Sequence, residues 1–232
     1  NKFIKNDIPT GKVLYYSDFR GDAGSEAFER ILIKNGYEKY DSSINIKDLE
    51  KGKRFTFITG SEKLEERKLN KDAFNDIDNL YGDKIQIMII SSAGAEGISL
   101  AAVRQVHIME TYWNYIRIDQ VFGRAIRLKS HLDLPEKDRV VDQYLYLSIY
   151  PEGNSIEEVY QSMKESGRWE DINIDISEGE DIKNYLLNHH RSIYTLIQKI
   201  LNIKQSTKGI TTDQQLFDIM EKKYNISNKI ID

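Results

Sequence analysis

The chain has 232 residues, of which 40% are hydrophobic, enough for one core with an appendage or for two small domains. Its formal net charge is -4, so the overall charge does not indicate a nucleic-acid binder, whose domains are usually basic. The lack of cysteine excludes disulfides and thiolate metal sites and suits a reducing compartment, and no apolar run of ~18 residues predicts a membrane span. The start at Asn1, without Met and in polar sequence, suggests a piece of a longer protein.

Strand and helix patterns alternate through residues 1–150. The nearly continuous apolar run at 85–91 is typical of a strand buried on both faces of a parallel sheet. Gly36 is expected at the C′ position after the first helix, and Ser61 is expected to cap the second. The alternation predicts an α/β fold with a doubly wound, mostly parallel sheet flanked by helices. The expected strands are 13–17, 54–59, 85–91, 103–109 and 139–149, and the expected helices are 26–32, 61–74 and 115–128.

The pattern changes after residue 150, where we expect a small helical C-terminal extension at 151–232. Helical patterns lie at 155–166, 181–203 and 212–224. The acidic tract at 170–181 is interpreted as a solvated loop, with a protein-contact or strand-excluding element as the alternative.

The helix expected at 115–128 carries two stripes. One is apolar, and the other places arginines on a second face together with a glutamine. An arginine fork can bind two oxygens of one phosphate, although most such pairs make ordinary surface ion pairs. Gly123, beside the arginines, allows a close backbone approach. The apolar stripe is Ile118, Val121, Phe122 and Ala125, and the polar stripe is Arg117, Gln120, Arg124 and Arg127.

Several sequence blocks resemble the motifs of superfamily 2 helicases and translocases, in the order of that family. Q-V-F-G-R-A-I-R at 120–127 resembles motif VI, S-S-A-G-A-E-G-I-S-L at 91–100 resembles motif V, and V-L-Y-Y-S-D-F at 13–19 resembles motif IV. Further similar blocks are F-I-T-G-S-E-K-L-E-E-R at 57–67, A-F-N at 73–75 and Y-W-N at 112–114. The resemblance implies that residues 1–150 form the second, C-terminal RecA-like domain of such a motor.

A narrower resemblance is to the nucleoside triphosphatases and early transcription factor small subunits of poxviruses and other large cytoplasmic DNA viruses. It rests on V-R-Q-V-H-I-M-E at 103–110, on K-S-H-L-D-L-P at 129–135 and, more loosely, on residues 212–223. Thr111 departs from the pattern, because proline is expected before the aromatic pair.

In this family ATP and Mg²⁺ are bound mainly by the N-terminal RecA-like half, and the second half supplies arginine fingers. The resemblance assigns that role to Arg124 and Arg127, which would stabilise charge on the γ-phosphoryl oxygens. It places Gln120 and Gly123 beside the nucleotide. Gly94, Glu96 and Gly97 would form the motif V turn of the nucleotide site, although these glycines also fit an ordinary strand-to-loop turn.

The family also grips DNA or RNA through phosphates at the strand ends, contacts that position a strand without selecting its sequence. An ordinary turn or cap role is the alternative for each hydroxyl residue. The nucleic-acid-binding residues carried over by position are Ser17, Arg20, Thr59, Gly60, Ser91 and Ser92.

The sequence contains neither a G-x-x-x-x-G-K-[ST] loop nor a D-E-x-H box, so we expect no ATP hydrolysis by this part alone. His107 is expected in the core, and His131 is a candidate for shaping the site. His189 and His190 have no partners at ligand spacing, so no metal site is predicted.

The function implied is the C-terminal motor half of an ATP-dependent helicase or translocase in viral transcription, located in the cytoplasmic viral factory or the virion. Its partners would be the N-terminal half, DNA or RNA, and subunits of a viral RNA polymerase or transcription factor, with no membrane. One alternative is a non-catalytic docking module of a transcription initiation complex. A second is a cellular chromatin-type translocase, against which the segment 129–135 argues.

Overall fold

The computed structural model describes residues 11–21, 24–92, 97–167, 174, 176 and 181–231, the last six in backbone alone. Two compact units make up the chain, Asn1–Leu147 with Ile219–Asp232, and Ser148–Asp218. No helix in the described ranges is both long and apolar enough to span a bilayer.

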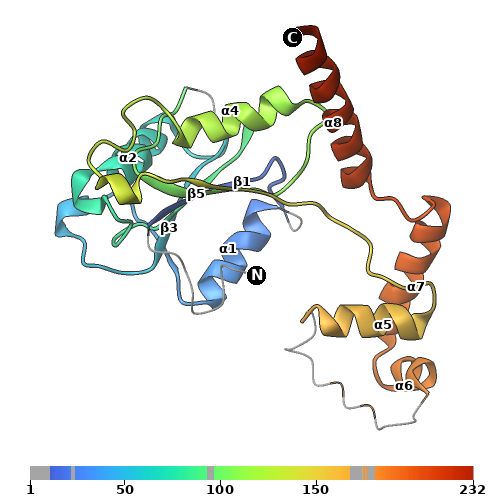
Figure 1. Cartoon of the computed structure of the whole chain (residues 1–232). Helices are drawn as coiled ribbons and strands as arrows, with labels where there is room; N and C mark the ends of the chain where they lie inside the picture. Colours follow the sequence, from blue (N-terminus) through green and yellow to red (C-terminus); the bar gives the residue numbers. More distant parts are fainter. Residues whose placement is uncertain are drawn as a thin grey trace. The chain divides into compact units, whose positions relative to one another are not determined.

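The first unit is built on a six-stranded sheet in which every pairing is parallel, in the order β2-β3-β4-β1-β5-β6 (Figure 1). The predicted doubly wound sheet is therefore confirmed. The sequence pattern missed β2, because two residues at a sheet edge carry no readable alternation. The strands are β1 (Lys12–Tyr16), β2 (Glu38–Lys39), β3 (Arg54–Ile58), β4 (Ile87–Ile90), β5 (Val103–Ile108) and β6 (Asp142–Leu145).

Helices cover both faces of this sheet. The helix α1 (Ser25–Lys34) lies on one face, and α2 (Leu64–Asn75) and α4 (Tyr115–Ala125) lie on the other (Figure 1). Since side chains alternate along a strand, Val13 and Tyr15 of β1 pack with Phe28 of α1, and the Tyr15 and Phe28 rings stack at 3.9 Å. The strand β4 is buried along its whole length, as its apolar run predicts.

The ends of α1 and α2 differ in how well the sequence predicts them. Gly36 follows α1 with φ +79, and the N–H of Tyr37 donates to the Leu32 carbonyl (3.0 Å), so the expected C′ glycine is confirmed. The expected cap at Ser61 is wrong, because α2 has Lys63 at its N-cap position. The Ser61 hydroxyl instead shares a hydrogen bond with the Thr59 hydroxyl (2.8 Å) in the turn after β3.

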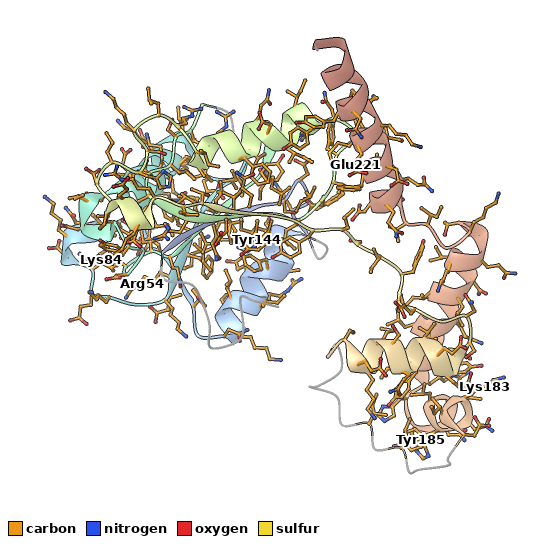
Figure 2. All side chains as sticks on the ribbon, viewed as in Figure 1. Arg54, Lys84, Tyr144, Lys183, Tyr185 and Glu221 are labelled. Carbon is orange, nitrogen blue, oxygen red and sulfur yellow. The ribbon has the colours of Figure 1, made fainter. Side chains whose placement is uncertain are left out.

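His107 on β5 belongs to the core, as expected. Its ring is buried and hydrogen-bonds to the Tyr146 hydroxyl (2.8 Å). It also stacks, with ring centroids 4.6 Å apart, on Tyr144 of β6, which is labelled in Figure 2. Burial lowers the pKa of His107 to about 4, so the imidazole is neutral at physiological pH.

The second unit is helical, with α5 (Ile156–Glu165), α6 (Ile182–His189), α7 (Arg191–Ser206) and the first residues of α8 (Thr212–Ile231). A capping box at Ser155 and Glu158 starts α5 where the sequence predicts a helix. The single helix expected at 181–203 is two helices, because the backbone of His190 leaves the helical region (φ -134, ψ 54). The acidic tract lies almost entirely outside the described residues.

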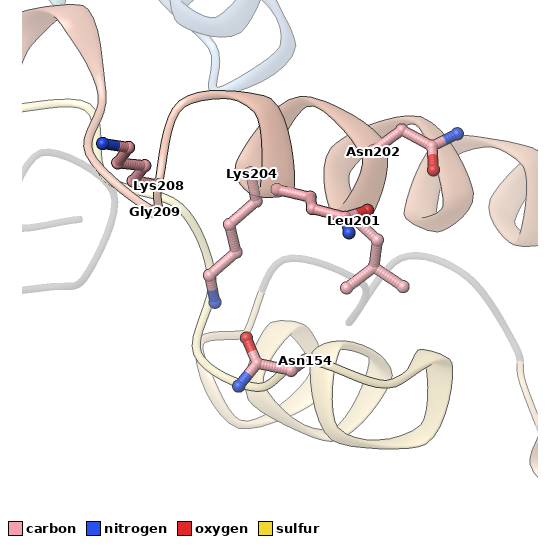
Figure 3. Close-up of a pocket in the computed structure, with 7 residues that line it drawn as sticks. Asn154, Leu201, Asn202, Lys204, Lys208 and Gly209 are labelled. Carbon is pink, nitrogen blue, oxygen red and sulfur yellow. The ribbon is translucent and has the colours of Figure 1, made fainter.

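A pocket of about 460 Å³ in this unit lies between the end of α7 and the segment that carries Asn154 (Figure 3). Lys204 reaches across from α7, and its ammonium donates to the carbonyls of Pro151 (3.1 Å) and Gly153 (2.6 Å). Two of the three ammonium donors of Lys204 therefore bond to backbone carbonyls and link α7 to the segment 151–153 within this unit.

Candidate functional site

The helix α4 forms where its two stripes predict it. The Asn114 side chain accepts the N–H of Ile116 (3.0 Å) as an N-cap. The helix stops at Ala125, whereas the sequence pattern extended it to 128. In the turn that follows, Ser130 accepts the N–H of Arg127 (3.2 Å), so Arg127 lies beyond the helix instead of on its polar stripe. The apolar stripe is buried as expected, and its members are Ile118, Val121, Phe122 and Ala125.

A pocket of about 290 Å³ lies along the polar face of α4. Of its two arginines, Arg117 pairs with Asp18 (2.9 Å) and lies over the ring of Tyr112 at 4.3 Å. Within the described ranges, no side chain pairs with the guanidinium of Arg124. Arg124 is therefore the cation that this pocket offers to an anionic ligand. The lining residues are Tyr16, Ser92, Asn114, Ile116, Arg117, Gln120, Val121 and Arg124.

Asp18, just beyond the carboxyl end of β1, is shared between two partners. Besides Arg117, it accepts the hydroxyl of Tyr16 (2.7 Å). Burial and, after it, the hydrogen bond to Asp18 raise the pKa of Tyr16 to about 12, so the phenol stays protonated. Sequence reasoning missed Asp18 as a site residue, although it stands inside the motif IV block. No spacing rule connects it to Arg117, 99 positions away.

Arg127 is exposed and is held from two sides. Its Nε donates to the carbonyl of Gly123 (3.2 Å), and its Nη1 donates to the hydroxyl of Ser99. A Cβ added to Gly123 would have nothing within 4 Å outside the neighbouring helix backbone, so no other segment among the described residues makes the close approach expected there. Gly97 has φ +73, a conformation that favours glycine, whereas Gly94 and Glu96 lie outside the described residues.

Ser17, Thr59 and Ser91 follow the neighbouring strands β1, β3 and β4 at their carboxyl ends. The register pairs Tyr16 and Ile58 with the same residue, Ile90, so the three hydroxyl residues stand at one level of the sheet edge. All three are buried. The remaining candidates for nucleic-acid binding, Arg20, Gly60 and Ser92, are exposed.

Two of these hydroxyls are engaged by carboxylates that the sequence did not single out. The Ser17 hydroxyl donates to Glu110 (2.5 Å), and the Thr59 hydroxyl donates to Glu62 (2.8 Å). Burial alone would raise the pKa of Glu62, but the hydrogen bonds that its carboxylate accepts, first those from Thr59, together outweigh burial and the net shift is downward. The Ser91 hydroxyl is buried without a hydrogen-bond partner, which makes it the free polar group of this edge in the described part of the chain.

His131 is linked to Arg127 through Ser130. Its ring contacts the carbonyl of Val103 (2.7 Å) and the hydroxyl of Ser130 (2.7 Å), the same Ser130 that accepts the N–H of Arg127. No cluster of histidine, aspartate and glutamate suited to a metal ion occurs among the residues that the structure describes.

Comparison with known proteins gives one family model, the helicase conserved C-terminal domain, which matches residues 9–129. A putative ATP-dependent RNA helicase of Acanthamoeba polyphaga mimivirus is 35% identical over 142 residues, covering 61% of this chain and 24% of that protein. An African swine fever virus termination factor NPH-I homolog is 43% identical over 96 residues, which are 41% of this chain and 14% of that protein. Nucleoside triphosphatase I of Melanoplus sanguinipes entomopoxvirus is 38% identical over 111 residues, 47% of this chain and 17% of that protein.

The chain thus spans at most about a quarter of these relatives. Among solved structures, the C-terminal part of the Fun30 ATPase domain aligns with a TM-score of 0.44 and 20% identity, covering 88% of this chain and 51% of that one.

Proposed function

This chain belongs to the helicase conserved C-terminal domain family, and from that membership we propose that it is the C-terminal motor half of an ATP-dependent helicase or translocase. The similar proteins are viral and carry the names of ATP-dependent helicases, a nucleoside triphosphatase and a termination factor homolog. The name of a termination factor supports a role in viral transcription. For that role we propose a location in the viral factory or the virion, with RNA polymerase or transcription factor subunits as partners.

The guanidinium of Arg124 at the pocket on α4, which pairs with no side chain of the described residues, is the observation that carries this proposal. Bound between this half and the N-terminal half, ATP would place its γ-phosphoryl group at the arginines of the segment 120–127. Arg124 and Arg127 would stabilise the charge on the phosphoryl oxygens, a contribution of roughly 10³ to 10⁵ in rate in other nucleotide hydrolases. Gln120 lies one helical turn before Arg124 and is exposed, so it can orient the nucleotide from the same face.

The nucleotide site is incomplete in this chain. Mg²⁺ would be held by the N-terminal half together with the phosphates, where it neutralises the developing charge. Gly97, with Gly94 and Glu96 before it, would complete the nucleotide site from the motif V turn. Since the sequence has no phosphate-binding loop, we expect the 232-residue chain alone to leave ATP intact.

The carboxyl edge of the sheet is the proposed track for DNA or RNA. The exposed Arg20, Gly60 and Ser92 can reach phosphates directly. Ser17 and Thr59 would contribute through the turns that their carboxylate partners hold. Ser91 offers a buried hydroxyl with no other partner in the described ranges.

The test is ATP turnover by the complete parent protein, alone and with single-stranded DNA, duplex DNA or RNA. Arg124→Ala and Arg127→Ala are each expected to remove most of the stimulated turnover. Arg191→Ala is the matched control, because Arg191 is an exposed arginine of the second unit. If neither substitution lowers ATP turnover, the finger assignment is overturned and a non-catalytic docking module is favoured.

A further inference from the structure

Asn75, the last residue of α2, ties two parts of the first unit together. Its Nδ2 donates to the carbonyl of Ser99 (2.9 Å), and its Oδ1 accepts the N–H of Ala101 (2.8 Å). One side-chain amide thus holds both ends of the short segment Ser99–Ala101, which follows the motif V turn. A side-chain amide suits this position, because it carries both the donor that one end requires and the acceptor that the other requires.

The same segment contacts the end of α4 from its other side. The hydroxyl of Ser99 accepts from Nη1 of Arg127, and the N–H of Leu100 donates to the carbonyl of Arg124 (3.0 Å). Ser99 therefore faces two ways: its carbonyl is fixed by Asn75, and its hydroxyl holds the guanidinium. The second contact of Arg127, from its Nε to the carbonyl of Gly123, is made four residues back along the chain, within α4.

We propose that Asn75 is a positioning residue for Arg127 and that it acts through Ser99. The inference rests on the proposed function, in which Arg127 must meet a phosphoryl group in a fixed orientation. Arg127 is exposed, so packing restricts its long side chain only weakly. A hydrogen bond to a clamped segment restricts the guanidinium before the nucleotide arrives, and such preorganisation is what makes a charged group effective in a transition state.

The first experiment follows the Arg127 side chain by NMR in the 232-residue chain. The Nη–H signal of Arg127, from the group that donates to Ser99, is assigned by its disappearance in Arg127→Lys. In Asn75→Ala and in Ser99→Ala we expect this signal to move to the position of freely exposed arginines. Asn35→Ala is the matched control, because Asn35 also stands at the end of a helix and donates to a carbonyl, that of Ile31 (2.8 Å). An Arg127 signal that is unchanged in Asn75→Ala overturns the inference.

The second experiment measures ATP turnover by the parent protein. Asn75→Ala and Ser99→Ala are each expected to lower kcat roughly 10-fold to 100-fold, the cost of a misplaced catalytic group, with a smaller change in the KM for ATP. In an Arg127→Ala background neither should lower kcat further, because the group they position is gone.

The two experiments separate the failure of the inference from the failure of the proposed function. A full additional loss from Asn75→Ala in the Arg127→Ala background would mean that Asn75 acts by another route, which overturns the inference. If Arg127→Ala alone leaves turnover intact, Arg127 is not a finger and the proposed function fails at that residue. The NMR result then decides whether Asn75 holds Arg127 at all.

Discussion

Arg117 donates to the carboxylate of Asp18 at 2.9 Å, joining α4 to the loop that follows β1 across 99 positions of sequence. The pair leaves the pocket on α4 with one neutralised arginine and with Arg124, which has no ion-pair partner in the part of the chain that the structure describes. Asp18, from the sequence block 13–19, therefore determines that Arg117 is paired while Arg124, on the same helix face, is left for a ligand.

We expect Asp18→Asn and Arg117→Gln to destabilise the chain non-additively. Both side chains are about one-third exposed (28% and 33%), so their coupling should be modest, about 0.5 to 1 kcal/mol. Urea unfolding of the two single variants and the double variant gives the coupling free energy. Strictly additive effects would mean that the pair contributes nothing to stability.

Arg124→Lys should behave nearly as Arg124→Ala in stimulated ATP turnover. A lysine keeps the charge but loses the planar fork that binds two oxygens at once, so charge alone should not restore the rate. The measurement is kcat and KM of the parent protein for the three versions. Recovery of most of the wild-type kcat by lysine would show that Arg124 acts as a point charge.

Arg20→Gln should weaken binding of DNA or RNA by the chain and reduce its salt dependence. Removing one cation from a phosphate lowers the slope of log K against log [salt] by about 1. Fluorescence anisotropy with a labelled single strand at several salt concentrations measures both quantities. Arg139→Gln serves as the control, because that exposed arginine is occupied by the carbonyls of Leu132 and Leu134. Equal slopes for all three proteins would remove Arg20 from the proposed track.

Lys12 should make the chain more stable as the pH rises from 7 to 9. Lys12 is fully buried at the start of β1, and burial lowers its pKa to about 7 from the ordinary 10.5, against an opposing contribution of Asp76. Between these two values the unfolded chain binds the proton and the folded chain does not, so the free energy of unfolding contributed by Lys12 rises by about 2 kcal/mol from pH 7 to pH 9. Below pH 7 the lysine is charged in both states and the contribution is constant.

Lys12→Met should remove this pH dependence and raise the free energy of unfolding at pH 7, because no charge is then buried. Urea unfolding at pH 7 and pH 9 measures it, with exposed Lys68→Met as the control. A wild-type pH dependence that survives in Lys12→Met would assign it to other groups.

The sheet and the family could be predicted because their signals are local. The apolar run of β4, the stripe of α4 and Gly36 are each contained in a few consecutive residues, and the structure confirms them. The match to the helicase C-terminal domain likewise confirms the motif resemblance. The cap of α2 and the end of α4 were misplaced, because the turns at 59–62 and 127–130 are fixed by side-chain hydrogen bonds between residues with no helix-breaking signal.

The partners of the site residues could not be predicted. Glu110 lies 93 positions from Ser17, and Asn75 lies 24 positions from Ser99. Such contacts depend on which strands become neighbours, and the order β4-β1-β5 brings together segments that are far apart in the sequence. Only after the topology is known does the carboxylate after β5 become the obvious acceptor for the hydroxyl after β1.

Because there is empty space beside Gly123, substitutions of increasing size at this position can measure the clearance above α4. An added methyl group meets no atom of the described residues within 4 Å beyond the neighbouring helix backbone, and alanine in a helix interior is favoured over glycine by up to ~1 kcal/mol. Gly123→Ala should therefore leave the isolated half intact or strengthen it. Any loss of turnover that it causes in the parent protein would report how tightly the N-terminal half closes on α4, and larger side chains at the same position would measure the clearance step by step.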